Sequence, residues 1–173
     1  MRLGVFLLVL VFVAMPAFAY DLTFFAGWTN VGSWKTAALA VDMHDFGVLG
    51  IRHEKGWGPI GFESGFAYYS QPVAPTQYQG GRGIGCTGNL VVNIPVFKPE
   101  PFLTVGLGVM HKFGKSVPDI GTQFISNYGF GVKMRKLAGP VGVRGEYRRI
   151  NVHDVVNSTV SFNELTAGLM LTF

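Results

Sequence analysis

Serine, histidine and aspartate occur in two combinations that could perform nucleophilic catalysis. Such catalysis requires a serine hydroxyl within hydrogen-bond reach of a histidine that an acidic group orients. One combination is His111 with Ser116, and the other is the His153-Asp154 pair with Ser158. Residues of these types occur in any chain of this length, so their presence alone does not indicate an enzyme. We expect no catalytic residues and no enzymatic activity.

Other chemically active residues are equally scattered. Four histidines lie in separate segments without the spacing of metal ligands: His44, His53, His111 and His153. The glycine-rich run at 80–83 lacks the Lys-Ser/Thr pair of a phosphate loop. The single cysteine, Cys86, is placed in a loop, where it is either a free thiol or a link between two molecules, and no internal disulfide is available. We therefore expect no metal and no cofactor.

The most informative spacing is that of Arg144, Glu146 and Arg148, which alternate with Val143 and Tyr147. In a strand this pattern gives one ionic face and one apolar face. An arginine facing lipid at the middle of a bilayer costs a barrel about 2–4 kcal/mol. Charges removed from water persist only when they are paired. We expect the ionic face to point into a shielded interior that holds both signs of charge.

The first residues have the pattern of a secretory signal peptide. Arg2 precedes an unbroken apolar run over 3–15, and Pro16-Ala17-Phe18-Ala19 follows it. The run is shorter than the roughly 20 residues that a membrane-spanning helix needs, so a retained anchor is the weaker interpretation. We expect a signal peptide at 1–19, with Ala17 and Ala19 as its cleavage-site residues, and one domain at 20–173. The residue directly after the expected cleavage point is Tyr20 rather than a cysteine, which argues against a lipoprotein.

The rest of the chain is hydrophobic without a second long apolar segment. The sequence has 24 glycines and 14% aromatic residues, with a mean hydropathy of +0.33. This combination is typical of strands in which apolar residues alternate with polar or small ones, as in a membrane-spanning β-barrel. The formal net charge of +4 is small and scattered along the chain, so we expect no nucleic acid partner.

Alternation with a period of two residues recurs along the chain and predicts eight strands. They are expected at 20–29, 46–54, 59–69, 87–96, 101–112, 122–134, 140–150 and 160–173. Tight turns at 55–58, 97–100 and 135–139 alternate with longer connections at 30–45, 70–86, 113–121 and 151–159. This regularity places both termini and all short turns at one end. It predicts an all-β, eight-stranded antiparallel up-and-down transmembrane barrel.

The same alternation assigns side chains to the two faces of the wall. The interior polar network is expected to contain Arg52, Glu54, Glu63, Asn89, Asn93, Asn127, Lys133, Arg144, Glu146, Arg148 and Glu164. Inward glycines are expected at Gly61, Gly65, Gly106, Gly108, Gly129, Gly131 and Gly168. Outward aromatic residues at the membrane interfaces are expected at Trp28, Phe62, Tyr68, Phe130, Tyr147 and Phe173. Since side chains fill the interior of an eight-stranded barrel, we expect a plugged interior and no open pore.

On these features the chain resembles the small eight-stranded outer-membrane barrels of the OmpA and OmpX type, within the outer membrane protein β-barrel domain group. The resemblance rests on the Ala17-Phe18-Ala19 site and on the segments 88–95, 124–131 and 169–173. It implies a location in the outer membrane of a Gram-negative bacterium. It also implies that Leu169, Leu171 and Phe173 form the signal read by the barrel-assembly machinery. We expect no periplasmic peptidoglycan-binding domain of the kind found in full-length OmpA.

Three functions are open at this point. The first is a monomeric, non-enzymatic barrel with a structural or loop-mediated surface role, in which Lys112, Lys115 and Arg149 near the outer rim contact the phosphates of lipopolysaccharide. The second is a lipid A deacylase or acyltransferase, although the chain lacks the His-x-Ser-Asn context of the deacylases. The third is a soluble periplasmic barrel of lipocalin shape, which would turn apolar residues inward. The inward ionic face favours the first function over the third.

Overall fold

The structure is a computed structural model built almost entirely from β-strands. It describes residues 21–30, 33–36, 39–42, 46–70, 82–94, 98–113, 121–155 and 158–173. The strands are β1 (Asp21–Asn30), β2 (Ser33–Thr36), β3 (Leu39–Asp42), β4 (Phe46–Trp57), β5 (Ile60–Ser70), β6 (Arg82–Asn93), β7 (Glu100–Phe113), β8 (Thr122–Ala138), β9 (Val141–Val155) and β10 (Ser158–Thr172). Within these residues no helix is both long and apolar enough to cross a membrane. The expected signal peptide, with Ala17 and Ala19, lies outside the described residues.

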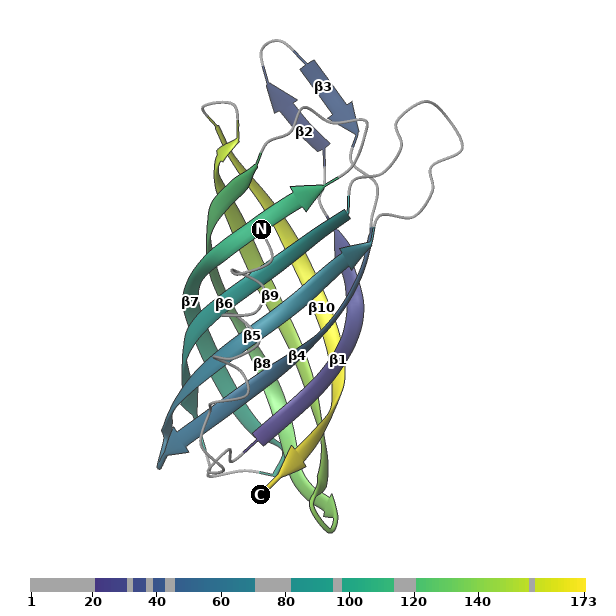
Figure 1. Ribbon diagram of the computed structural model, residues 1–173. Helices are drawn as coiled ribbons and strands as arrows, with labels where there is room; N and C mark the ends of the chain where they lie inside the picture. Colours follow the sequence, from purple (N-terminus) through teal and green to yellow (C-terminus); the bar gives the residue numbers. More distant parts are fainter. Residues whose placement is uncertain are drawn as a thin grey trace, which may run out of the picture.

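Eight of these strands close into one barrel. Around the wall the order is β1, β10, β9, β8, β7, β6, β5 and β4, and every neighbouring pair is antiparallel. β1 pairs with β10 on one side and with β4 on the other, which closes the cylinder (Figure 1). The predicted eight-stranded antiparallel barrel is therefore confirmed.

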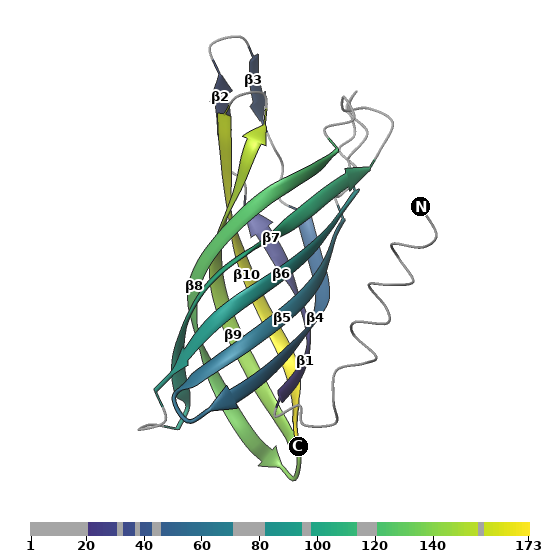
Figure 2. The same cartoon turned by 60° about the vertical axis from the view of Figure 1, so that its left-hand side comes forward.

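The connections differ between the two ends of the barrel. At the end that carries the C-terminus, which we call the turn end, Gly58 and Gly139 begin two-residue turns with φ of 62°. Glycine reaches this left-handed region without steric cost. At the opposite end, the loop end, β2 and β3 form a separate antiparallel hairpin beyond the wall (Figure 2). The sequence pattern had predicted a plain loop over 30–45.

Several residues lie on strands rather than in the connections where they were expected, and Cys86 and Arg135 are among them. Cys86 is a half-buried residue of β6, so its placement in a loop was wrong. Gly83 and Gly85 gave this segment the composition of a loop, but both are buried beside the ring of Tyr69. A Cβ atom at Gly85 would come within 3.2 Å of the Tyr69 ring, so glycine at this position leaves room for the ring. Arg135 likewise belongs to β8, because the turn that follows needs only two residues.

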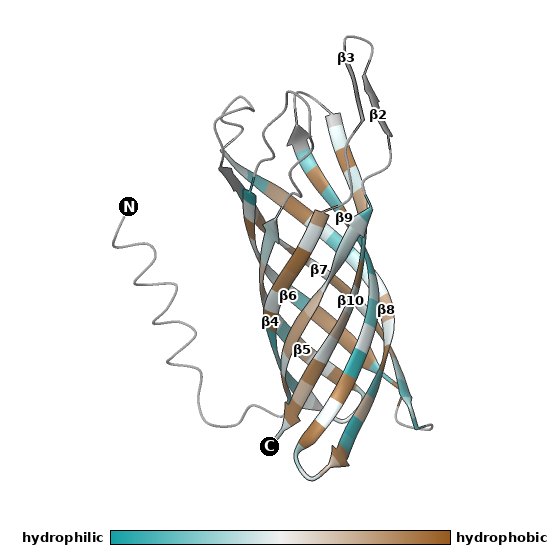
Figure 3. Ribbon diagram, turned by 90° about the vertical axis from the view of Figure 1, so that its right-hand side faces the viewer, coloured by the Kyte–Doolittle hydropathy of each residue, from teal (hydrophilic) through white to brown (hydrophobic). Residues whose placement is uncertain are grey.

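The wall separates an apolar outer face from a mixed inner face. On β7, the exposed Leu103 and Val105 alternate with the buried Phe102 and Thr104. Figure 3 shows this alternation as brown and teal blocks along the strands. Of the aromatic residues expected on the outer face, Tyr68 is half-buried and the others are exposed: Trp28, Phe62, Phe130, Tyr147 and Phe173.

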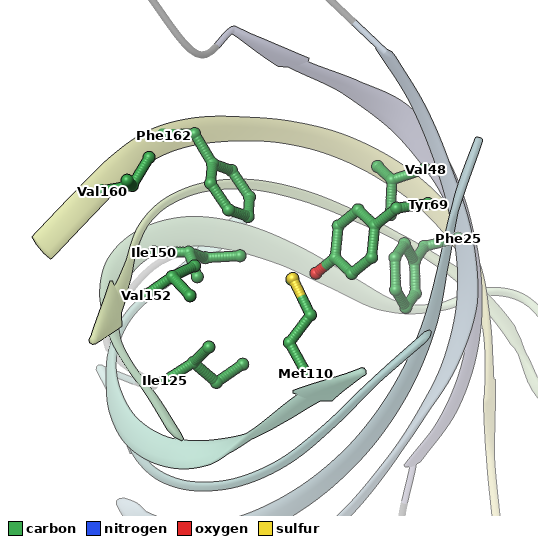
Figure 4. Packing of buried hydrophobic residues seen from close by; sticks show 9 residues of the cluster. All are labelled: Phe25, Val48, Tyr69, Met110, Ile125, Ile150, Val152, Val160 and Phe162. Carbon is green, nitrogen blue, oxygen red and sulfur yellow. The ribbon is translucent and has the colours of Figure 1, made fainter. Parts of the chain in front are cut away.

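The interior has two layers of different chemistry. Near the loop end lies the apolar layer, which Figure 4 shows: Phe25, Val48, Tyr69, Met110, Ile125, Ile150, Val152, Val160 and Phe162. Nearer the turn end lies the ionic layer: Arg52, Glu54, Glu63, Lys133, Arg144, Glu146, Arg148 and Glu164. The sequence pattern indicated an ionic interior, whereas the apolar layer, which includes the inward Phe25, is a second element of the core.

Candidate functional site

The charged face of β9 forms the centre of the ionic layer. Arg144, Glu146 and Arg148 point into the barrel and are each 3% exposed. Val143 and Tyr147 lie between them on the outer face, because successive residues of a strand point to opposite sides. The other residues assigned to the interior network are also buried there: Arg52, Glu54, Glu63, Asn93, Asn127, Lys133 and Glu164.

Arg52 of β4 binds two carboxylates, one from β9 and one from β10. Its Nη1 lies 2.8 Å from Oε2 of Glu146, and its Nη2 lies 2.8 Å from Oε1 of Glu164. Nη1 also donates to Oγ1 of Thr166 at 3.3 Å. The guanidinium carbon stands 3.8 Å from the ring centroid of Phe25, a cation–π contact. Arg52 therefore connects β4 with β9 and β10 across the interior.

Arg144 and Arg148 share two carboxylates. Arg144 lies 2.6 Å from Oε2 of Glu63 through Nη1 and 2.9 Å from Oε2 of Glu146 through Nη2. Arg148 contacts the other oxygen of each carboxylate at 2.5 Å. Glu63 and Glu146 are thus each held between the same two arginines. Together with Arg52 and Glu164 they form a group of three cations and three anions, which balances the charge that burial removes from water.

A second cluster lies closer to the turn end. Lys133 Nζ is 2.5 Å from Oε2 of Glu54 and donates to Oδ1 of Asn93 at 2.8 Å. Asn93 in turn donates from Nδ2 to Oε1 of Glu54 at 3.0 Å. Arg135 pairs with Asp21 at 2.7 Å and also with Glu100. The strand ends at this mouth are therefore tied together by charge.

Asp21, Glu100 and Arg135 were not among the residues expected in the interior network. Asp21 and Glu100 are the first residues of their strands, and Arg135 was assigned to a turn. The alternation itself could have found Arg135, which lies two residues beyond the inward Lys133. Arg135 was missed because the strand was expected to end at residue 134, whereas β8 continues to Ala138.

A chain of amides and one hydroxyl extend the network. Asn127 donates from Nδ2 to Oδ1 of Asn89 at 2.9 Å, and Asn89 donates from Nδ2 to Oε1 of Glu63 at 2.9 Å. The hydroxyl of Tyr69 donates to Oε2 of Glu164 at 3.2 Å. Because the ring of Tyr69 belongs to the apolar layer, this single hydrogen bond joins the two layers.

Glycine provides the space that the network needs. A Cβ atom at Gly106 would collide with the side chain of Asn89 and with the carbonyl oxygen of Gly88. At Gly131 it would collide with the ring of Phe102, against which Lys133 packs with its Nζ 4.5 Å from the centroid. These positions accept no side chain while the neighbouring groups keep their places.

On the outer face of β8, β9 and β10, the side chains change from apolar to polar toward the loop end. Tyr147 is exposed, and the next outward residue of β9 is the exposed Arg149. In register with Arg149 lie Tyr128 of β8 and Asn163 of β10. Arg149 was one of three basic residues expected to contact lipopolysaccharide. The side chain of Lys112 and all of Lys115 lie outside the described residues.

Two polar pairs lie on the same outer face, closer to the loop end. Ser126 Oγ lies 2.8 Å from Nε2 of His153. Ser161 donates from Oγ to Oδ1 of Asn151 at 2.7 Å. The contact between Ser126 and His153 was not foreseen, because the two residues are distant in sequence and meet through the pairing of β8 with β9.

The two serine–histidine combinations considered from the sequence each include residues outside the described part of the chain. His111 contacts Thr122 through Nδ1 and Oγ1 at 3.1 Å. Ser116 and the side chains of Asp154 and Ser158 lie outside the described residues. Of the three residues of the expected assembly signal, Leu169 and Phe173 are exposed and Leu171 is half-buried.

Comparison with known proteins places this architecture in a family. Residues 5–173 match the model of the outer membrane protein beta-barrel domain. No curated protein sequence matches the chain. Among solved structures, Neisserial surface protein A (NspA) is 16% identical with a TM-score of 0.69, covering 88% of this chain and 96% of that protein.

Two other solved structures share the fold. Outer membrane protein H (OprH) from P. aeruginosa is 14% identical with a TM-score of 0.57, covering 90% of this chain and 100% of that protein. The outer membrane enzyme PagL is 15% identical with a TM-score of 0.52, covering 88% of this chain and 99% of that protein. These likenesses concern the fold alone. The match over nearly the whole sequence, joined to the closed eight-stranded wall, shows that the chain belongs to the outer membrane protein β-barrel domain family and is a bacterial outer-membrane barrel.

Proposed function

We propose that this protein is a monomeric, non-enzymatic outer-membrane barrel with a plugged interior, and that it acts through its outer loops and outer rim. The observation that carries the proposal is the group formed by Arg52, Arg144 and Arg148 with Glu63, Glu146 and Glu164. All six residues are at most 4% exposed, so their charges bind one another across the interior rather than water.

Two features support a barrel closed to ions. The interior of an eight-stranded barrel is just wide enough to be filled by side chains. Here the ionic layer fills it toward the turn end and the apolar layer toward the loop end. A permeating ion would have to separate buried ion pairs and then pass a layer lined mainly by apolar side chains, which is costly.

The surface role follows from where polar side chains reach the outside. An up-and-down outer-membrane barrel places its tight turns in the periplasm and its longer connections outside the cell. Arg149 then lies on the outer face near the lipopolysaccharide phosphates, and we propose it as a contact, together with Lys112 and Lys115. Leu169, Leu171 and Phe173 are proposed as the signal for the barrel-assembly machinery.

Ion conductance in planar lipid bilayers tests the closed interior. We expect no stepwise conductance from the folded wild-type barrel, under conditions in which an open porin gives clear steps. Folding of the inserted sample is verified by the change in electrophoretic mobility between unheated and heated protein. Stable, reproducible channel steps from the wild-type barrel would contradict the proposal.

A second candidate function, hydrolysis of an acyl ester in the outer leaflet, is favoured by the contact between Ser126 and His153. His153 would accept the proton as the Ser126 hydroxyl attacks the ester carbonyl. His153 would pass this proton to the departing alkoxide, which leaves as the alcohol, and water would then hydrolyse the acyl-serine ester to release the fatty acid and restore the serine hydroxyl. Among the described side chains no carboxylate contacts His153, and we therefore rank this function second.

Mass spectrometry of lipid A separates the two functions. Lipid A is incubated with vesicles that contain the wild-type barrel or the Ser126→Ala variant. We expect both samples to leave every acyl chain in place. Loss of an acyl chain with the wild type, but not with Ser126→Ala, would establish the hydrolase and overturn the non-enzymatic proposal.

A further inference from the structure

A shallow apolar groove crosses the outer face of the wall at the level of the ionic layer, because Gly145 in its lining lies between the inward Arg144 and Glu146. Its volume is about 420 Å³, within the range of roughly 300–1,000 Å³ that is typical of sites for small ligands. The groove spans four neighbouring strands, β1, β10, β9 and β8. Nothing in the ionic network or in the tight turns requires this hollow.

The groove exists because small outward residues lie side by side. Ala26, Ala167 and Gly145 are paired in register and form its floor. The row above the floor, toward the loop end, consists of large exposed side chains: Trp28, Leu165, Tyr147 and Phe130. The row below it consists of Phe24, Leu169, Val143 and Met134, which are also exposed. The groove itself is lined by the floor and by the upper row, and a hollow with this apolar lining fits a narrow hydrocarbon chain.

A cation stands directly above the groove. Arg149 is the next outward residue after Tyr147 on β9, which places it about 7 Å further along the strand. Among the residues that the structure describes, Arg149 has no ion-pair or hydrogen-bond partner, whereas the arginines of the interior are all paired. Asn163 lies in register with it on β10. The row therefore offers a positive charge and an amide to an anionic group.

The apolar groove and the cation above it match the two ends of one amphiphile. We propose that the groove holds an acyl chain of a lipid A molecule whose phosphate binds Arg149. This inference rests on the proposed function, because it places the loop end in the leaflet that contains lipopolysaccharide. Charge complementarity selects an anionic lipid. The groove lies below Arg149, on the side away from the loop end, where an acyl chain that descends from a phosphate bound at Arg149 would reach it.

Retention of lipids during native mass spectrometry tests the proposal. Folded barrel in detergent micelles is mixed with bisphosphorylated lipid A, with fully dephosphorylated lipid A or with phosphatidylglycerol. Gly145→Leu fills the groove, since a Cβ there meets nothing closer than Val132 at 3.9 Å. Arg149→Gln removes the charge. The matched controls are Gly88→Leu, where a Cβ meets only ordinary contacts with Phe62, and Arg82→Gln, which removes another exposed cation.

We expect the wild type and both controls to retain a single bisphosphorylated lipid A. Gly145→Leu and Arg149→Gln should each need about tenfold more lipid A for half-saturation, as removal of one charged contact implies for the latter. Equal retention by either variant and the wild type would overturn the proposal. So would equal retention of phosphatidylglycerol or dephosphorylated lipid A. Heat-dependent mobility and conductance are measured on the same samples, so a folded, non-conducting barrel without lipid A selectivity contradicts this inference and leaves the proposed function standing.

Discussion

The ionic layer and the apolar layer line the interior of the same barrel by different means. In the ionic layer, Arg144 and Arg148 share Glu63 and Glu146, so the position of each group depends on several others. In the apolar layer, the rings of Tyr69 and Phe162 pack edge to face at 6.0 Å, a contact in which no charged group takes part. Apolar packing tolerates exchanges of similar volume, whereas a buried ion tolerates no loss of its partner. The positions of the interior side chains are therefore fixed more strictly toward the turn end than toward the loop end.

The largest expected effect comes from introducing a charge into the apolar layer. Ile125 is fully buried there. We expect Ile125→Glu to lower the free energy of unfolding by about 5 kcal/mol, since a buried ion without a partner costs several kcal/mol. Urea titration of the barrel in lipid vesicles measures the change, with Ile125→Leu as the volume-matched control. If Ile125→Glu proves as stable as the control, the two layers do not differ in the way described.

Removal of one shared carboxylate should have the next largest effect. Glu146 contacts three arginines, Arg52, Arg144 and Arg148. We expect Glu146→Ala to lower the free energy of unfolding by about 3–5 kcal/mol, because it leaves buried cations without their partner. The same urea titration applies. The exposed Arg149→Ala is the control and should change stability little. A loss below about 1 kcal/mol for Glu146→Ala would contradict the role of this carboxylate.

A smaller effect is expected where the layers meet. Tyr69→Phe keeps the ring in the apolar layer and removes the hydroxyl that donates to Glu164. Hydrogen bonds to charged groups contribute about 1.5–3 kcal/mol, so we expect a loss in that range. The measurement is again the urea midpoint, combined in a double-mutant cycle with Glu164→Gln. Additive effects of the two substitutions would show that the hydroxyl and the carboxylate do not interact.

The smallest effect is expected from trimming the apolar layer. Ile150→Val removes one methylene group from a residue that is 3% exposed. We expect a loss of about 0.5–1.5 kcal/mol, the usual cost of this change in a core. Thermal unfolding followed by the mobility shift in electrophoresis is sensitive enough when compared with wild type on one gel. A loss equal to that of Glu146→Ala would remove the distinction between the layers.

Much of the architecture could be predicted from the sequence because strand residues alternate strictly between the two faces. One charged strand, β9, sufficed to decide which face was inside, and that decision assigned Arg52 and Glu164 without any knowledge of their partners. The pairs themselves could not be predicted. They depend on the register between strands and on how far side chains reach across the interior, neither of which leaves a local signal.

The errors also have physical causes. Cys86 was assigned to a loop because neighbouring glycines weaken the strand pattern, although Gly85 makes room for Tyr69. The apolar layer was missed because an inward Phe25 contradicts the simple rule of polar inside and apolar outside. The contact of Ser126 with His153 arises only when β8 and β9 pair. In each case tertiary packing determined what composition alone could not.

The long sequence separations within the ionic layer have a consequence for the order of assembly. Arg52 and Glu164 are 112 residues apart, and their strands are separated around the wall only by β1. The first and last parts of the chain must therefore meet before this pair can form. Until then the arginine and the carboxylate each lack their counter-charge. A barrel closed in the wrong register would leave these charges without their partners. The buried charges therefore favour closure in the correct register.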